Sequence, residues 1–62
     1  MAKLNKKDLD KLWKKFQSNK NGLTIDEYKS ISDSAITLYH SNQMTAEDAK
    51  KMMSAVSPYY NG

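Results

Sequence analysis

The sequence predicts an all-α fold, a small three-helix bundle with short connecting turns, in a single domain over residues 1–62. A helix-start pattern occurs three times, apolar residues follow each start at helical spacing, and no segment indicates a strand. Amphipathic helices joined by short turns bury their apolar stripes most simply against one another. We therefore expect one core, built from one side of each helix.

Each predicted helix begins with the same local pattern. The segments LNKKDL, LTIDEY and MTAEDA place a large apolar residue first, an N-cap residue second, and an acid three positions after the cap. A cap side chain accepts a hydrogen bond from a backbone N–H that the helix leaves unpaired, and the acid faces the positive helix end. The caps with their acids are Asn5 with Asp8, Thr24 with Glu27, and Thr45 with Asp48.

The apolar residues after each start define the three helices. The first is expected near residues 6–17, the second near 25–40 and the third near 46–57, where Ser57 and Pro58 are expected to end it. The inward stripe of the first helix is Leu9, Leu12, Trp13 and Phe16. That of the second is Tyr28, Ile31, Ala35, Leu38 and Tyr39, widened by Ile25 and Ile36. That of the third is Ala49, Met52, Met53 and Val56.

The segment SISDS, residues 30–34, places three serines and an aspartate inside the second predicted helix. Such side chains compete for backbone hydrogen bonds and lower helix propensity. A bend is one interpretation. We favour a solvated polar face, because the apolar residues keep their period across the segment.

The length of the chain limits its stability. A domain of 62 residues hides only about 60% of the surface that its unfolded form exposes, and such a core typically supplies no more than ~3–5 kcal/mol. With no cysteine, disulfides are absent. Binding to a partner, or self-association into a homo-oligomer, would add stability. The absence of cysteine and of an apolar leader or membrane span favours a cytoplasmic protein that does not enter the membrane.

The segment SNKNGLTIDEY has the outline of a calcium-binding EF-hand loop, which needs oxygen ligands at loop positions 1, 3, 5 and 12. With Gly22 at loop position 6, these positions hold Gln17, Asn19, Asn21 and Tyr28. With Glu27 at loop position 12, the first three hold Phe16, Ser18 and Lys20. Neither register forms a site, so we interpret Thr24 to Glu27 as a capping box and expect no metal and no other cofactor.

Residues typical of catalysis are sparse. His40 is the only histidine, and it is expected in the last turn of the second helix, where it would favour the negative helix end. With two glycines in the chain, neither a nucleophile elbow nor a phosphate-binding loop occurs. We therefore expect no catalytic residues and no enzymatic activity.

The positive charge is concentrated near the N-terminus. Residues 1–20 carry a local charge of +5 and the rest −2, for a net charge of +3. Six lysines on or before the first helix form a predicted basic ridge: Lys3, Lys6, Lys7, Lys11, Lys14 and Lys15. It would attract a phosphate backbone or an acidic protein by a salt-sensitive force, but a solvated face of good helix formers explains it equally well. Specific DNA reading is disfavoured, because arginine is absent and the third helix opens with Glu47 and Asp48.

The chain also has more apolar residues than a three-helix core obviously absorbs. The surplus defines a predicted interface patch: Met52, Met53, Tyr59, Tyr60 and Ile36. Methionine and tyrosine are adaptable interface residues. Alternatively, Tyr59 and Tyr60 fold back to cover the end of the bundle, and the two interpretations stay open.

The sequence thus favours a non-catalytic, protein-binding or regulatory module whose partner is a protein of unknown identity. Abundant Lys, Asn, Ile and Tyr without Arg suggests an AT-rich genome, and so a phage or mobile-element modulator of a host protein. The alternative is a nonspecific nucleic-acid-binding protein that uses the basic ridge.

Overall fold

A computed structural model describes residues 4–61, with Asn61 described by its backbone alone. Three helices make up this part of the chain: α1 (Lys6–Ser18), α2 (Ile25–His40) and α3 (Ala46–Asn61). No strand occurs among the described residues. The predicted all-α three-helix bundle is confirmed, and all three helices begin at the residues that the capping pattern indicated.

The three predicted caps are present. The side chain of Asn5 accepts a hydrogen bond from the Asp8 N–H at 2.8 Å, and that of Thr45 accepts one from the Asp48 N–H at 3.2 Å. At α2 the box is reciprocal: Thr24 Oγ1 accepts from the Glu27 N–H at 3.1 Å, and Glu27 Oε1 accepts from the Thr24 N–H at 3.0 Å. The interpretation of this segment as a capping box is therefore confirmed.

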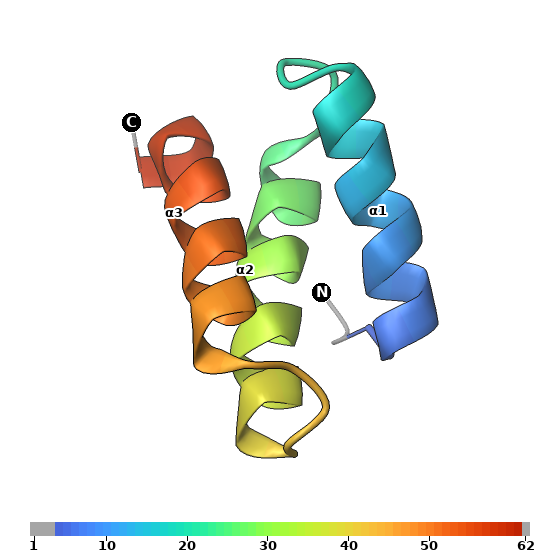
Figure 1. The fold of residues 1–62 in the computed structure, drawn as a ribbon. Helices are drawn as coiled ribbons and strands as arrows, with labels where there is room; N and C mark the ends of the chain where they lie inside the picture. Colours follow the sequence, from blue (N-terminus) through green and yellow to red (C-terminus); the bar gives the residue numbers. More distant parts are fainter. Residues whose placement is uncertain (1–3, 62) are drawn as a thin grey trace.

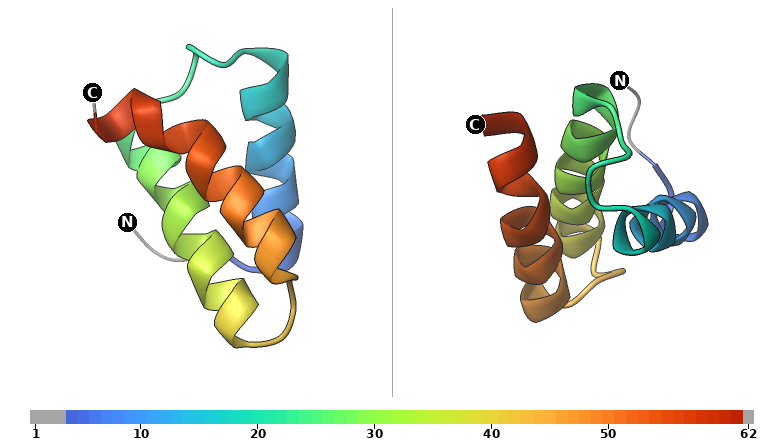
Figure 2. Two further views of the ribbon diagram at one scale, coloured as in Figure 1. Left: turned by 60° about the vertical axis from the view of Figure 1, so that its left-hand side comes forward. Right: turned by 90° about the horizontal axis from the view of Figure 1, so that it is seen from above.

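Helix α2 is the central element of the bundle. Helix α3 runs antiparallel beside it, joined by a short turn, and α1 lies on its other side (Figures 1 and 2). The buried apolar core draws on all three helices and on the residues before α2 and α3: Leu9, Phe16, Leu23, Tyr28, Ile31, Ala35, Leu38, Met44, Ala49, Met52 and Val56. The inward stripes predicted for α1 and α3 supply much of this core.

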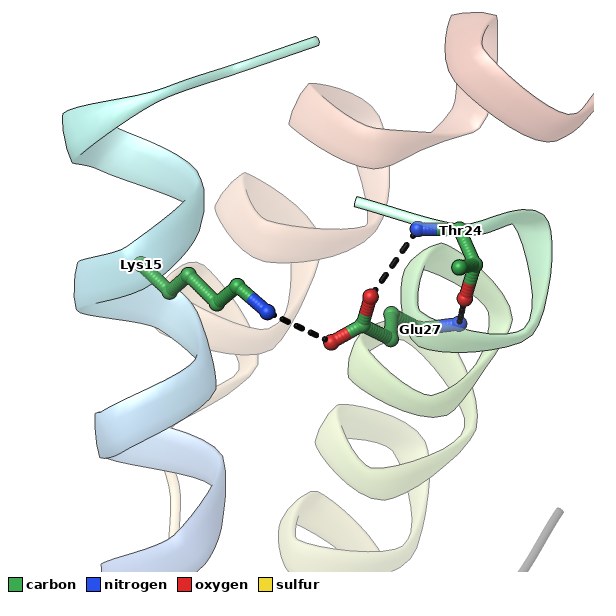
Figure 3. A network of polar contacts seen from close by, with 3 residues as sticks. All are labelled: Lys15, Thr24 and Glu27. Carbon is green, nitrogen blue, oxygen red and sulfur yellow. Dashed lines mark hydrogen bonds and ion pairs between the residues drawn. The ribbon is translucent and has the colours of Figure 1, made fainter. Parts of the chain in front are cut away.

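An ion pair joins α1 to the start of α2. Lys15 Nζ lies 3.2 Å from Glu27 Oε2, while the other oxygen of the same carboxylate accepts from the Thr24 N–H (Figure 3). The Thr24 N–H and the Lys15 ammonium both favour the charged carboxylate, and together they hold the pKa of Glu27 below its usual value. One side chain thus caps α2 and also links it to α1 through an ion pair at the surface.

The prediction that helix three ends at residue 57 is wrong. Helix α3 continues through Pro58 to Asn61. Proline removes one backbone donor from the helix, which costs stability. Side chains beyond it make packing contacts that offset this cost: the Tyr59 ring stacks on Tyr28 at 4.9 Å between centroids, and the Tyr60 hydroxyl donates to Ser32 Oγ at 3.1 Å.

The interpretation of residues 30–34 as a solvated polar face is correct for Asp33, which is exposed, but wrong for the three serines. Ser30, Ser32 and Ser34 are 2%, 6% and 0% exposed, and α2 passes through them without interruption. Ser34 Oγ accepts a hydrogen bond from the Leu4 N–H at 2.8 Å. Small side chains let neighbouring segments approach α2 closely, and the hydroxyls of Ser32 and Ser34 give polar groups of those segments a partner. These serines therefore belong to helix packing and not to the surface.

Helix α2 ends in a Schellman motif. The N–H of Gln43 donates to the carbonyl of Leu38 at 2.9 Å, and that of Asn42 donates to the carbonyl of Tyr39 at 3.1 Å. Asn42 adopts a φ of 62°, the left-handed conformation that this motif requires. The chain turns back here at once, which sets α3 antiparallel beside α2.

Candidate partner-binding groove

An open groove of about 370 Å³ lies between the C-terminal half of α2 and the N-terminal half of α3. Helix α1 contributes nothing to its lining. The residues that line it are Ile36, Tyr39, His40, Ala46, Ala49, Lys50 and Met53.

Helical spacing brings these residues together. On α2 they recur at i, i+3 and i+4, and on α3 at i, i+3, i+4 and i+7, so each set forms one continuous stripe along its helix. The two helices are antiparallel neighbours, which places the stripes on either side of one seam. The small side chains of Ala46 and Ala49 lie between larger ones and leave the seam open.

The groove is apolar along its length and has one lysine at its rim. Ile36 and Met53 are half-buried, whereas Tyr39 is 43% exposed although it is a large aromatic residue. The rings of Tyr39 and His40 lie 5.4 Å apart between centroids at the end of α2. Lys50 is exposed and has no ion-pair partner in residues 4–61. Among residues 4–61, no carboxylate contributes to the lining.

The structure divides the predicted interface patch. Ile36 and Met53 come together in the groove. Met52 is 8% exposed and belongs to the core, so it is not available on the surface as the patch requires. Tyr59 packs against the core, with its ring 5.5 Å from that of Phe16 in an edge-to-face arrangement. For Tyr59, the interpretation that it folds back onto the bundle is the correct one.

Tyr60, the last member of the patch, lies beyond the groove on α3. It is half-buried, and its hydroxyl is bound to Ser32 on α2. Its spacing of i+7 from Met53 continues the same stripe of α3 for two further turns. This contact also agrees with the interpretation in which the C-terminal tyrosines cover the bundle.

Sequence reasoning assigned Tyr39 to the core and did not assign Lys50 or Ala46 to any site. Tyr39 stands at the edge of the α2 stripe, next to Ile36, where a small rotation of the helix decides between burial and exposure. Its i+3 spacing from Ile36 was the available signal, because two large apolar residues at the flank of an already complete stripe indicate a second apolar face.

The predicted basic ridge is reduced by ion pairs within the described part of the molecule. Lys6 pairs with Asp10 at 3.7 Å, and Lys15 pairs with Glu27. Lys3 lies outside the described residues. Three members remain exposed without an ion pair among residues 4–61, on the side of α1 opposite its buried stripe, and we call them the outer lysines: Lys7, Lys11 and Lys14.

His40 lies in the last turn of α2, as predicted. Within residues 4–61, no cluster of three or more His, Asp or Glu side chains is arranged to hold a metal ion. None of the three helices, as far as they are described, combines the length and the apolar character needed to cross a bilayer.

Comparison with family models, with curated proteins and with solved structures gives no match for this chain.

Proposed function

We propose that the protein is a non-catalytic, regulatory module that binds another protein at the α2–α3 groove. The observation that carries the proposal is the position of Ile36, Tyr39 and Met53, which leave apolar surface open to solvent in a chain too short to supply a large core. Exposed apolar surface lowers solubility, and in small soluble proteins it commonly marks an interaction site.

The composition of the groove supports this function. Tyrosine and methionine are enriched at the centres of protein interfaces, where an aromatic ring inserts into a partner and contributes much of the binding energy. Tyr39 lies beside the His40 ring at the end of α2. The genomic setting inferred from composition, a phage or mobile-element modulator, remains a prediction.

The function is tested by comparing Tyr39→Ser with Ile25→Ser. Both residues are large, apolar and exposed on α2, at 43% and 56%, but only Tyr39 lines the groove. Each tagged variant is used to isolate partners from the organism of origin, after circular dichroism has shown that it is folded. We expect the amount of partner bound by Tyr39→Ser to be at least tenfold lower than that bound by the parent. Ile25→Ser should bind as much as the parent. Equal retention by both variants would reject the groove as the binding surface.

A second candidate function, nonspecific nucleic-acid binding, is favoured by the outer lysines. Their ammonium groups are exposed and carry no ion pair in the described chain, and they follow one line along α1. If all three lysines contact phosphates, a plot of the logarithm of the affinity against the logarithm of the salt concentration has a slope of about −2.7. The affinity then falls roughly 40-fold between 50 and 200 mM salt. An apolar protein interface would change little over the same range.

Replacing the outer lysines by glutamine tests this candidate. The combined variant Lys7→Gln, Lys11→Gln and Lys14→Gln keeps helix propensity, because glutamine and lysine are similar helix formers. We expect it to abolish the binding of a fluorescent single-stranded or duplex oligonucleotide and to leave partner binding at the groove unchanged. Unchanged oligonucleotide affinity in the variant would show that the outer lysines do not bind nucleic acid.

A further inference from the structure

The groove also indicates what kind of partner it fits. Building on the proposed function, we infer that its occupant is an amphipathic α-helix of another protein that carries a carboxylate facing Lys50 and His40. The inference rests on three features: the length of the groove, the secondary structure of its walls, and the sign of its charge.

The length of the groove matches two turns of a helix. Along α3 the lining extends from Ala46 to Met53, and seven residues at 1.5 Å each span about 10 Å. An occupant of this length presents apolar residues at i, i+3, i+4 and i+7. Two of these residues would fill the space above Ala46 and Ala49, between the side chains of Ile36 and Met53.

The walls favour a helix over an extended peptide. An extended segment gains affinity chiefly by adding to an exposed sheet edge, and residues 4–61 form no strand that could offer one. The seam between two helices presents ridges and grooves of side chains into which the ridges of a third helix pack. The recognition mode is therefore helix-in-groove.

The charge of the rim selects an acidic occupant. Lys50 is unpaired in the described chain, His40 stands across the seam from it, and no carboxylate lines the groove. A carboxylate on the occupant would complete an ion pair at the edge of an apolar contact, where surrounding side chains reduce solvent screening.

The test uses two synthetic amphipathic helices that differ only in charge. Both carry leucine at i, i+3, i+4 and i+7; one has glutamate and the other lysine at the positions flanking the stripe. Each peptide is titrated into the isotope-labelled full chain at low salt. Amide NMR shifts locate the binding site, and fluorescence anisotropy gives the affinity.

We expect the glutamate peptide to shift the amides around the groove and to bind about tenfold more tightly than the lysine peptide. The variant Lys50→Glu should reverse this order. The combined glutamine variant of the outer lysines, which lie on the far side of α1's buried stripe, should leave it unchanged. Lys50 is exposed, so the charge reversal is not expected to unfold the chain.

Failure of this inference is distinguishable from failure of the proposed function. Equal affinity of the two peptides at the groove overturns the acidic preference while protein binding there stands. Shifts that map to the outer lysines, or no groove shifts with either peptide, overturn the helical acidic occupant. Whether the groove binds a protein at all is tested separately, by whether Tyr39→Ser loses or retains its natural partner.

Discussion

Two serines one turn apart on α2 should respond in opposite ways to the same substitution. Ser30 and Ser34 are both buried, at 2% and 0% exposed. Ser34 Oγ accepts the Leu4 N–H, whereas the Ser30 hydroxyl has no hydrogen-bond partner in the described part of the chain. We predict that Ser30→Ala stabilises the fold and that Ser34→Ala destabilises it.

The magnitudes follow from these contacts. A buried hydroxyl without a partner costs about 1–3 kcal/mol, and alanine is a better helix former than serine by up to about 0.5 kcal/mol. After allowance for the small void, Ser30→Ala should raise the free energy of unfolding by about 1 kcal/mol. Ser34→Ala gains the same helix propensity but leaves the Leu4 N–H without its hydrogen-bond acceptor. The free energy of unfolding should therefore fall by about 0.5–1.5 kcal/mol.

Such changes are large in a domain whose core supplies only ~3–5 kcal/mol, and each kcal/mol moves the Tm by about 4–8 °C. Urea unfolding followed by Trp13 fluorescence, with thermal melts followed by circular dichroism, measures both variants against the parent. Trp13 is a suitable reporter because its ring stacks on that of Phe16 in the core, 5.2 Å away. A loss of stability in Ser30→Ala, or shifts of the same sign in both variants, would refute the reasoning.

Three further predictions concern the helix ends and the core. Asn42→Gly should stabilise the chain by up to about 1 kcal/mol in urea unfolding, because glycine adopts the left-handed φ of 62° without strain. Glu27→Gln should be less stable than the parent at pH 7. Because the folded-state pKa of Glu27 is lowered, that difference should shrink as the pH falls below the ordinary glutamate value of about 4.3, as unfolding curves at several pH values will show. Leu9 is 0% exposed, so Leu9→Ala leaves a cavity in the core and should lower the free energy of unfolding by about 2–5 kcal/mol. Most of the helical circular dichroism signal should then be lost at 37 °C.

The features that the sequence predicted correctly are those decided within a few residues. Each helix start depends on a cap and on the residue three positions later, so Asn5, Thr24 and Thr45 could be identified without knowledge of the fold. The inward stripe of α1 is equally local, because its residues share one side of a single helix.

The features that it missed depend on contacts between distant segments. Ser34 is buried because the backbone at Leu4 crosses it, 30 residues away in sequence, and Ser32 because Tyr60 reaches it from α3. The continuation of α3 past Pro58 likewise depends on the packing of tyrosines against α2 and α1. Polarity and propensity, which are properties of single residues, carry no signal for any of these contacts.

In the candidate site, too, the sequence indicated local features but not contacts between helices. The surplus of apolar residues placed Ile36 and Met53 in one predicted patch, and both line the groove, although Met53 was also assigned to the inward stripe of the third helix. Their meeting with Tyr39 and Lys50 depends on the register between α2 and α3, which the Schellman turn at Asn42 sets. Sequence alone gave no basis for that register.

The central claim, that the α2–α3 groove is the surface that binds a protein, is tested most directly by site-specific crosslinking. A photoreactive phenylalanine analogue is placed at position 39 in the groove, or at position 25 as an exposed control on the same helix, and the chain is irradiated in its organism of origin. We expect one discrete protein adduct from position 39 that is absent from position 25. Adducts of equal yield from both positions, or none from position 39 while the outer lysines retain nucleic acid, would contradict the account.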